Sequence, residues 1–260
     1  MDVVKLLGLL CVSASAALLA AEAGCGGVVA AFTIFPLIRP ATVPEEENSA
    51  DSVVERYVSD ICITLDEMSH IYNRTLVALF RQNTRVLRDM SRRSAKLCRE
   101  SETRRRAGVA LRSSGADDMG AWLFGTRATV YLAEVCEALE RIVRPACEHV
   151  ERGAGAFSKE QTIALMRMND AVDAMIHKVT AALWKDNAAE GVSEVRRQRN
   201  EVLDFVRECI REQIMRGGDE ENTGTDLLFL TLLGETKTLT LRMSNLLKIK
   251  SYSLQSADGK

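Results

Sequence analysis

The sequence contains few aromatic residues and very few prolines. Aromatic side chains make up 5% of the 260 residues, and there are four prolines. The most frequent residues are instead strong helix formers such as alanine, leucine, arginine and glutamate. This balance predicts an all-α protein, and a hydrophobic share of 47% is enough for one large or two small packed units.

The common signatures of enzymes and disulfide-rich proteins are also missing. None of the seven cysteines forms a Cys-x-x-Cys pair, and five lie in helical patterns, which indicates reduced, mostly buried thiols of a cytosolic compartment. The sequence also shows no strand that is followed by a glycine-rich phosphate-binding loop. The three histidines, His70, His149 and His177, lie on different expected helices, and isolated histidines are usually structural. We therefore expect neither enzyme activity nor a bound cofactor.

The first forty residues are strongly hydrophobic. Residues 3–38 carry only two charges, Lys5 and Glu22, and the flanking runs 6–21 and 23–38 are each slightly short of the about 20 residues that span a bilayer. We interpret residues 1–40 as a membrane segment, followed by an acidic linker over residues 41–50. A cleaved signal peptide, with a small-residue site near Ala14 to Ala16, and a buried soluble hairpin are the alternatives.

The clearest helical pattern lies between residues 128 and 150. Apolar residues alternate there at steps of four and three, which places one apolar stripe along a helix. The stripe consists of Ala128, Leu132, Val135, Leu139, Ile142 and Ala146. We expect this helix over residues 117–152, with Pro145 kinking it or ending it locally. A helix with such a stripe needs neighbours along its whole length.

Five further helices are expected around it, over residues 51–80, 84–111, 158–184, 190–215 and 223–250, and residues 251–260 form a tail. The fourth of the six begins at the capping box Ser158-x-x-Gln161. The last has an apolar set formed by Leu227, Leu230, Leu233, Leu241, Leu246 and Leu247. Long helices with short turns predict an elongated antiparallel bundle.

One face of the second helix is densely basic. Its members recur every three or four residues and are Arg81, Arg85, Arg88, Arg92, Lys96 and Arg99. The face is either solvated surface or a contact for anionic lipids or an acidic partner, worth about 1 kcal/mol per charge near a membrane. Nucleic acid is disfavoured because no aromatic residues interleave the arginines, and a net charge of −2 adds no argument for it.

The six helices divide into two similar halves. The turns at residues 80–83 and 184–187 resemble each other at an offset of 104, and residues 131–132 and 229–230 at an offset of 98. Both offsets fit a three-helix unit. We therefore expect a first repeat over residues 51–155 and a second over residues 156–250.

Two three-helix repeats of this kind resemble the PhoU-like domains of bacterial phosphate physiology. The third helix carries the Leu-Glu-Arg-Ile signature of that family at Leu139, Glu140, Arg141 and Ile142. Further segments are similar to the cytosolic C-terminal extension of bacterial inorganic phosphate transporters of the PiT or sodium–phosphate cotransporter type. Those segments contain Glu148, His149, Glu235, Lys237 and Asn245. The resemblance covers about residues 51–250.

The resemblance implies a regulatory or structural part of a phosphate transporter, at the bacterial inner membrane with the helical domain facing the cytoplasm. Implied partners are membrane lipids and a transporter core in the same or a separate chain, with inorganic phosphate as the transported ion; a homodimer is a further possibility. The alternatives are a freestanding PhoU-like adaptor in phosphate signalling and an exported helical protein with a cleaved signal peptide.

The chain departs from the family where metal clusters are held. PhoU proteins with such clusters place an acidic residue shortly after the Leu-Glu-Arg-Ile signature, where this chain has Arg144 and Pro145. The last helix has Lys237 and Thr238 where further acidic residues would be needed. We therefore expect no metal site.

Overall fold

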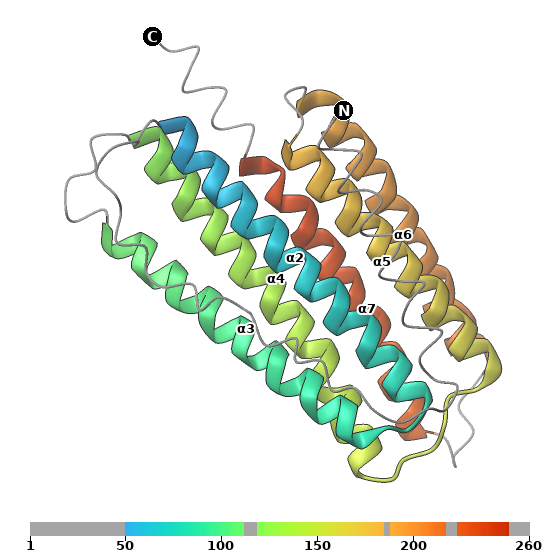
Figure 1. Ribbon diagram of the computed structural model, residues 1–260. Helices are drawn as coiled ribbons and strands as arrows, with labels where there is room; N and C mark the ends of the chain where they lie inside the picture. The colour runs from blue at the N-terminus through green and yellow to red at the C-terminus, as the bar shows by residue number, and fades with distance from the viewer. Residues whose placement is uncertain (1–49, 112–118, 185–187, 217–222, 250–260) are drawn as a thin grey trace, which may run out of the picture. The chain divides into compact units, whose positions relative to one another are not determined.

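The computed structural model describes residues 50–111, 119–184, 188–216 and 223–249, and this part of the chain forms six helices and no strands (Figure 1). Their bounds are α2 (Ala50–Phe80), α3 (Thr84–Leu111), α4 (Met119–Glu151), α5 (Lys159–Trp184), α6 (Ala188–Arg216) and α7 (Thr223–Leu246). The all-α prediction is confirmed, and each expected helix lies within four residues of its observed bounds.

Local chemistry explains where the helices begin and end. After α2, Gln82 adopts a left-handed φ of 53°, and Asn83 Oδ1 accepts the backbone N–H of Val86, which caps α3. Gly153, at a φ of 67°, follows α4. The capping box before α5 is present in both directions: Ser158 Oγ accepts the Gln161 N–H at 3.2 Å, and Gln161 Oε1 accepts the Ser158 N–H at 3.0 Å.

The helices pack as two groups of three joined through their inner members. Within the first group α2, α3 and α4 all contact one another, and within the second α5, α6 and α7 do the same. The groups meet through α4 against α7 and α2 against α5. The helices α2, α4, α7 and α5 therefore form a central bundle, with α3 and α6 on its opposite sides (Figure 1).

The predicted stripe of α4 lies in the middle of the core. All six of its members are buried, and Val135, Leu139, Ile142 and Ala146 are fully inaccessible to solvent. The helix contacts α2, α3 and α7. Its expected need for neighbours along its length is confirmed, because three different helices cover it.

Two expectations about helix interiors can be compared with the structure. Of the two effects expected of Pro145, a kink or a local end, the end does not occur, since α4 continues to Glu151; burial of Val143, Ala146 and Val150 holds the last turns against the core. In α7, Leu227 is 65% exposed and Leu241 37% exposed, so the leucine set does not define the buried face. That face instead includes three threonines, Thr225, Thr236 and Thr240, which the leucine pattern left out.

None of the described helices contains a segment long and apolar enough to cross a bilayer. The membrane segment expected at residues 1–40, most of the acidic linker and the tail at 251–260 lie outside the described residues.

Candidate functional site

The four residues of the Leu-Glu-Arg-Ile signature lie in three places: Leu139 and Ile142 in the core, Arg141 at α7, and Glu140 in a groove between α3 and α4. Arg141 points to α7, where its Nε donates a hydrogen bond to Glu235 Oε2 at 2.9 Å. The sequence singled out Arg141 and Glu235 separately, and the structure shows that they are partners.

A second ion pair joins the same two helices, with the arginine on α7 and the glutamate on α4. Arg242 of α7 donates through Nη1 to the backbone carbonyl of Glu134 at 3.1 Å and lies 3.6 Å from the Glu134 carboxylate. In each helix the glutamate precedes the arginine by seven residues, Glu134 to Arg141 and Glu235 to Arg242. The two helices are therefore joined by reciprocal pairs related by a local twofold arrangement. Sequence reasoning missed this, although the equal spacing was a visible signal.

The Arg141–Glu235 pair is expected to contribute a small, measurable coupling. Both side chains are about one-third exposed, at 38% and 26%, so a double-mutant cycle with Arg141→Ala and Glu235→Ala should give a coupling of about 0.5–1 kcal/mol. Urea unfolding of the four proteins measures it. The same cycle with Arg141→Ala and Glu208→Ala on α6 is the control. Equal coupling in both cycles would show that the Arg141–Glu235 pair has no specific role in stability.

His149 has a structural position at the link between the two halves. It is 7% exposed, its Nε2 donates to the Gly155 carbonyl at 3.0 Å, and its ring stacks on Phe157 at a centroid distance of 5.9 Å. The neighbouring Glu148 pairs at the surface with Arg152. The structure therefore places His149 in the packing of the α4–α5 connection.

The basic face of α3 is exposed along its whole length, at Arg81, Arg85, Arg88, Arg92, Lys96 and Arg99. Three of these residues pair with nearby carboxylates: Arg88 with Glu151 at 2.6 Å, Arg92 with Asp89 at 3.4 Å and Lys96 with Glu100 at 3.7 Å. Among the described residues, no ion pair involves Arg85 or Arg99. The face is thus partly neutralised and still carries a positive surplus.

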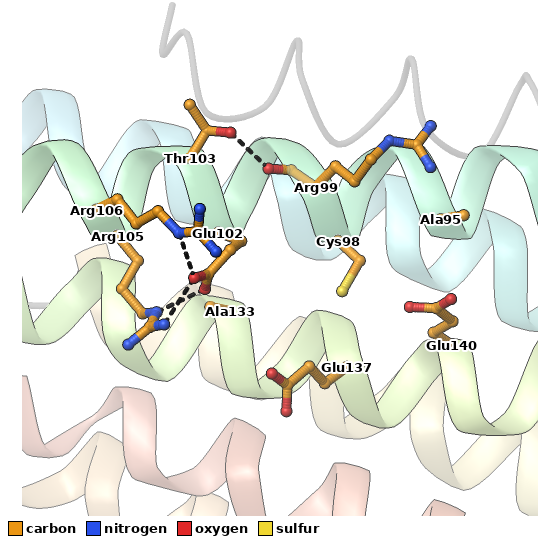
Figure 2. A pocket seen from close by; sticks show the side chains of 10 residues that line it. All are labelled: Ala95, Cys98, Arg99, Glu102, Thr103, Arg105, Arg106, Ala133, Glu137 and Glu140. Carbon is orange, nitrogen blue, oxygen red and sulfur yellow. Dashed lines mark hydrogen bonds and ion pairs between the residues drawn. The ribbon is translucent and has the colours of Figure 1, made fainter.

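A groove of about 490 Å³ lies between α3 and α4 (Figure 2). Glu102 holds two of its three arginines: Arg105 donates at 2.6 and 2.7 Å and Arg106 at 2.8 Å. These hydrogen bonds lower the pKa of Glu102 to about 2. Glu137 and Glu140 add negative charge on the α4 side, so positive and negative groups in this groove largely balance.

The thiols of this region are expected to react slowly. Burial, followed by hydrogen bonding with Glu140, raises the pKa of Cys98 to about 11, and burial raises that of Cys136 to about 12. At pH 8 the thiolate fraction of Cys98 is then about one in a thousand. We predict that iodoacetamide labels Cys98 in the folded protein at least about tenfold more slowly than in urea, with a rate that rises with pH up to about 11. Mass spectrometry of tryptic peptides measures both, and equal folded and unfolded rates at pH 8 would contradict the prediction.

A second groove, of about 340 Å³, lies between α6 and the end of α7. Asn245, which the sequence singled out, lines its α7 side together with Lys248, which follows the end of that helix. From α6 come Arg196 and Arg199, which sequence reasoning did not single out. Nothing in the local pattern of α6 distinguishes them from the other arginines of that helix.

The structure brings no three potential metal ligands together among the described residues. His70 and His177 are exposed on α2 and α5, and His177 lies 3.4 Å from Asp173 of its own helix. Arg144 and Lys237, at positions where the resemblance implied acidic residues in metal-binding members, are both exposed.

The sequence matches no protein-family model and no curated protein. The bundle, however, superposes on the crystal structure of the phosphate transport system regulatory protein PhoU from Streptococcus pneumoniae with a TM-score of 0.60 and 13% identity, over 80% of this chain and 98% of that one. It superposes on the crystal structure of PhoU from Pseudomonas aeruginosa with a TM-score of 0.62 and 13% identity, over 80% of this chain and 100% of that one. The fold is PhoU-like.

The resemblance stated from the sequence is therefore confirmed at the level of the fold. The PhoU-like bundle accounts for almost the full length of both PhoU structures. Identity of 13% shows the fold alone.

Proposed function

We propose that this chain is a non-enzymatic regulator of phosphate transport that acts by binding a membrane transporter. The observation that supports the proposal best is the match of its bundle to nearly the entire length of two PhoU structures, one of which is described as a phosphate transport system regulatory protein. The transporter-like segments around Glu148, Glu235 and Asn245 support a domain attached to, or working beside, an inorganic phosphate transporter.

In this proposal the bundle lies at the cytoplasmic face of a bacterial inner membrane. The basic face of α3 is its contact, because α3 is a flanking helix and the six basic side chains of this face, Arg81 to Arg99, are all exposed. Anionic lipid head groups or acidic loops of the transporter attract such a face. Contacts that differ between two states of the transporter then bias it toward one of them.

A freestanding adaptor in phosphate signalling is the second candidate. The matched part of this chain, 80% of its length, corresponds to 98–100% of the two PhoU chains, so it has the size of the PhoU chains in those structures. Affinity purification of the full chain from membranes and from cytosol distinguishes the two. A transporter partner in the membrane fraction supports the first, and a kinase or ATPase partner in the cytosol supports the second.

Charge reversal tests the proposed contact. We expect Arg85→Glu, Arg88→Glu and Arg92→Glu together to weaken binding to anionic vesicles more than about tenfold, because six units of charge are changed next to the lipid. Phosphate uptake should then change in cells that carry the variant. Cosedimentation and uptake of labelled phosphate measure the two effects.

The matched control reverses three exposed arginines of α6, Arg197, Arg207 and Arg211, each of which pairs with a carboxylate one turn away. It makes the same change in net charge on the other flanking helix. If both triple variants bind vesicles and support uptake equally, the basic face of α3 is only solvated surface.

A further inference from the structure

The groove between α6 and α7 has an unusual charge balance. Three basic residues, Arg196, Arg199 and Lys248, line it, and no carboxylate does. The groove between α3 and α4 also has three arginines, but three glutamates line it with them. An anion would therefore meet compensating carboxylates between α3 and α4, and a net positive wall between α6 and α7.

The two arginines of this groove keep their charge uncompensated. Arg199 donates through Nε and Nη2 to the Asn200 side-chain oxygen, at 3.2 and 3.0 Å, and that partner is neutral. Within the described helices, Arg196 takes part in no ion pair. Guanidinium groups in this state bind phosphate oxygens through charge-assisted, often bidentate, hydrogen bonds.

Neutral polar groups come from α7. Ser244 and Asn245 line the groove one helix away from the arginines. Ser244 Oγ already donates to the Leu241 carbonyl at 2.7 Å, which leaves its lone pairs as acceptors. The Asn245 amide can donate to an anion. Asn245 therefore offers a donor on the α7 side of the groove.

The groove has the size for a small molecule. Its volume of about 340 Å³ is at the lower end of the range of about 300–1,000 Å³ for ligand pockets, and Val192, Val195 and Leu247 give it an apolar lining. We propose that the α6–α7 groove binds the phosphate group of a small anionic ligand, with Arg196 and Arg199 as the principal contacts. The phosphate belongs either to a soluble phosphorylated compound or to a lipid head group.

This inference goes beyond the proposed function and does not depend on it. Its test compares variants of Arg196 and Arg199 in the groove for binding to pyrophosphate and vesicles, whereas the test of the proposed function compares variants of the α3 face for vesicle binding and uptake. One can fail while the other succeeds.

Calorimetry with pyrophosphate at constant ionic strength is the first arm of the test, and cosedimentation with phosphatidylglycerol vesicles is the second. We expect Arg196→Glu with Arg199→Glu to weaken binding by about tenfold or more, because two charge-assisted hydrogen bonds are lost. Arg207→Glu with Arg211→Glu, on the same helix with the same charge change and away from the groove, should leave it within about twofold. Arg196→Gln, a milder change at an exposed site, should weaken binding without altering the thermal midpoint.

Pyrophosphate binding that is lost only in the groove variants supports a soluble phosphorylated ligand. Vesicle binding without pyrophosphate binding, lost in the same variants, supports the site and assigns the phosphate to a lipid. No binding in either arm, or equal loss in the Arg207 and Arg211 control, overturns the proposal.

Discussion

Leu139→Ala is expected to lower the free energy of unfolding by about 2–5 kcal/mol. Leu139 is completely buried in α4, and α2, α3 and α7 pack around this helix. The close-packed neighbours cannot shift enough to fill a cavity left at this position. The loss consists of the transfer free energy of the deleted methyl groups and the cavity that they leave. Urea unfolding followed by circular dichroism measures it, with an unchanged slope as the sign of an unchanged fold.

Leu227→Ala is the matched control, because it deletes the same atoms from a leucine that is 65% exposed. Its effect should stay within about 0.5 kcal/mol. If the two variants were equally stable, Leu139 would not occupy the core position that the structure gives it, and the family signature would need another explanation than packing.

Gly125→Ala is expected to destabilise the protein by about 1–3 kcal/mol, although alanine is the better helix former. A Cβ at Gly125 of α4 would lie 2.5 Å from two ring carbons of Tyr57 of α2. The Tyr57 ring is half-buried and packs near Phe124 at a centroid distance of 6.4 Å, so it has little room to move. The position of the Tyr57 ring against α4 therefore leaves no room for a methyl group at Gly125.

Two further variants separate the collision from other effects. Tyr57→Ala removes the ring, so Gly125→Ala should cost less in that background than in the original protein. Gly234→Ala in α7, where no atom lies within 4 Å of the new methyl group, should stabilise the helix by about 0.5–1 kcal/mol. Thermal unfolding of the set checks the opposite signs, and a destabilising Gly234→Ala would show that glycine has another function in these helices.

The sequence predicted the fold well where one face of a helix differs chemically from the other. In α4 the buried residues are apolar and the remaining surface carries charges, so the stripe through Leu139 was unambiguous. The start of α5 followed equally well, since the Ser158 capping box marks it. These are local signals that need no knowledge of neighbouring helices.

In α7 that contrast is missing. Leucines occur around the whole helix, and the core is completed by threonines whose hydroxyls are satisfied internally: Thr240 Oγ1 donates to the Thr236 carbonyl at 2.9 Å, and Thr236 shares a hydrogen bond with Tyr72 at 3.1 Å. A threonine with a satisfied hydroxyl packs much like a small apolar residue. The pattern alone could not show this, and two members of the expected apolar set, Leu227 and Leu241, are exposed.

The candidate sites were only half visible in the sequence. Arg141, Glu235 and Asn245 were named from family-like segments, but their partners are set by which helices meet in space. Arg196 and Arg199 gain their significance because they face a helix that begins more than twenty residues later in the chain. Along α6 they do not differ from the other arginines of the helix. They stand out only because no carboxylate lines the groove between them and α7.

The reciprocal pairs between α4 and α7 have a consequence for assembly. A glutamate and an arginine seven residues apart make each helix the electrostatic complement of an antiparallel copy of itself. In the intact chain these pairs form between α4 of the first half and α7 of the second, within one molecule. Folding therefore leaves neither pair available to a second molecule. A homodimer of the full chain must therefore form through other faces, and a half released from its partner would find a ready match in a second half of the same kind.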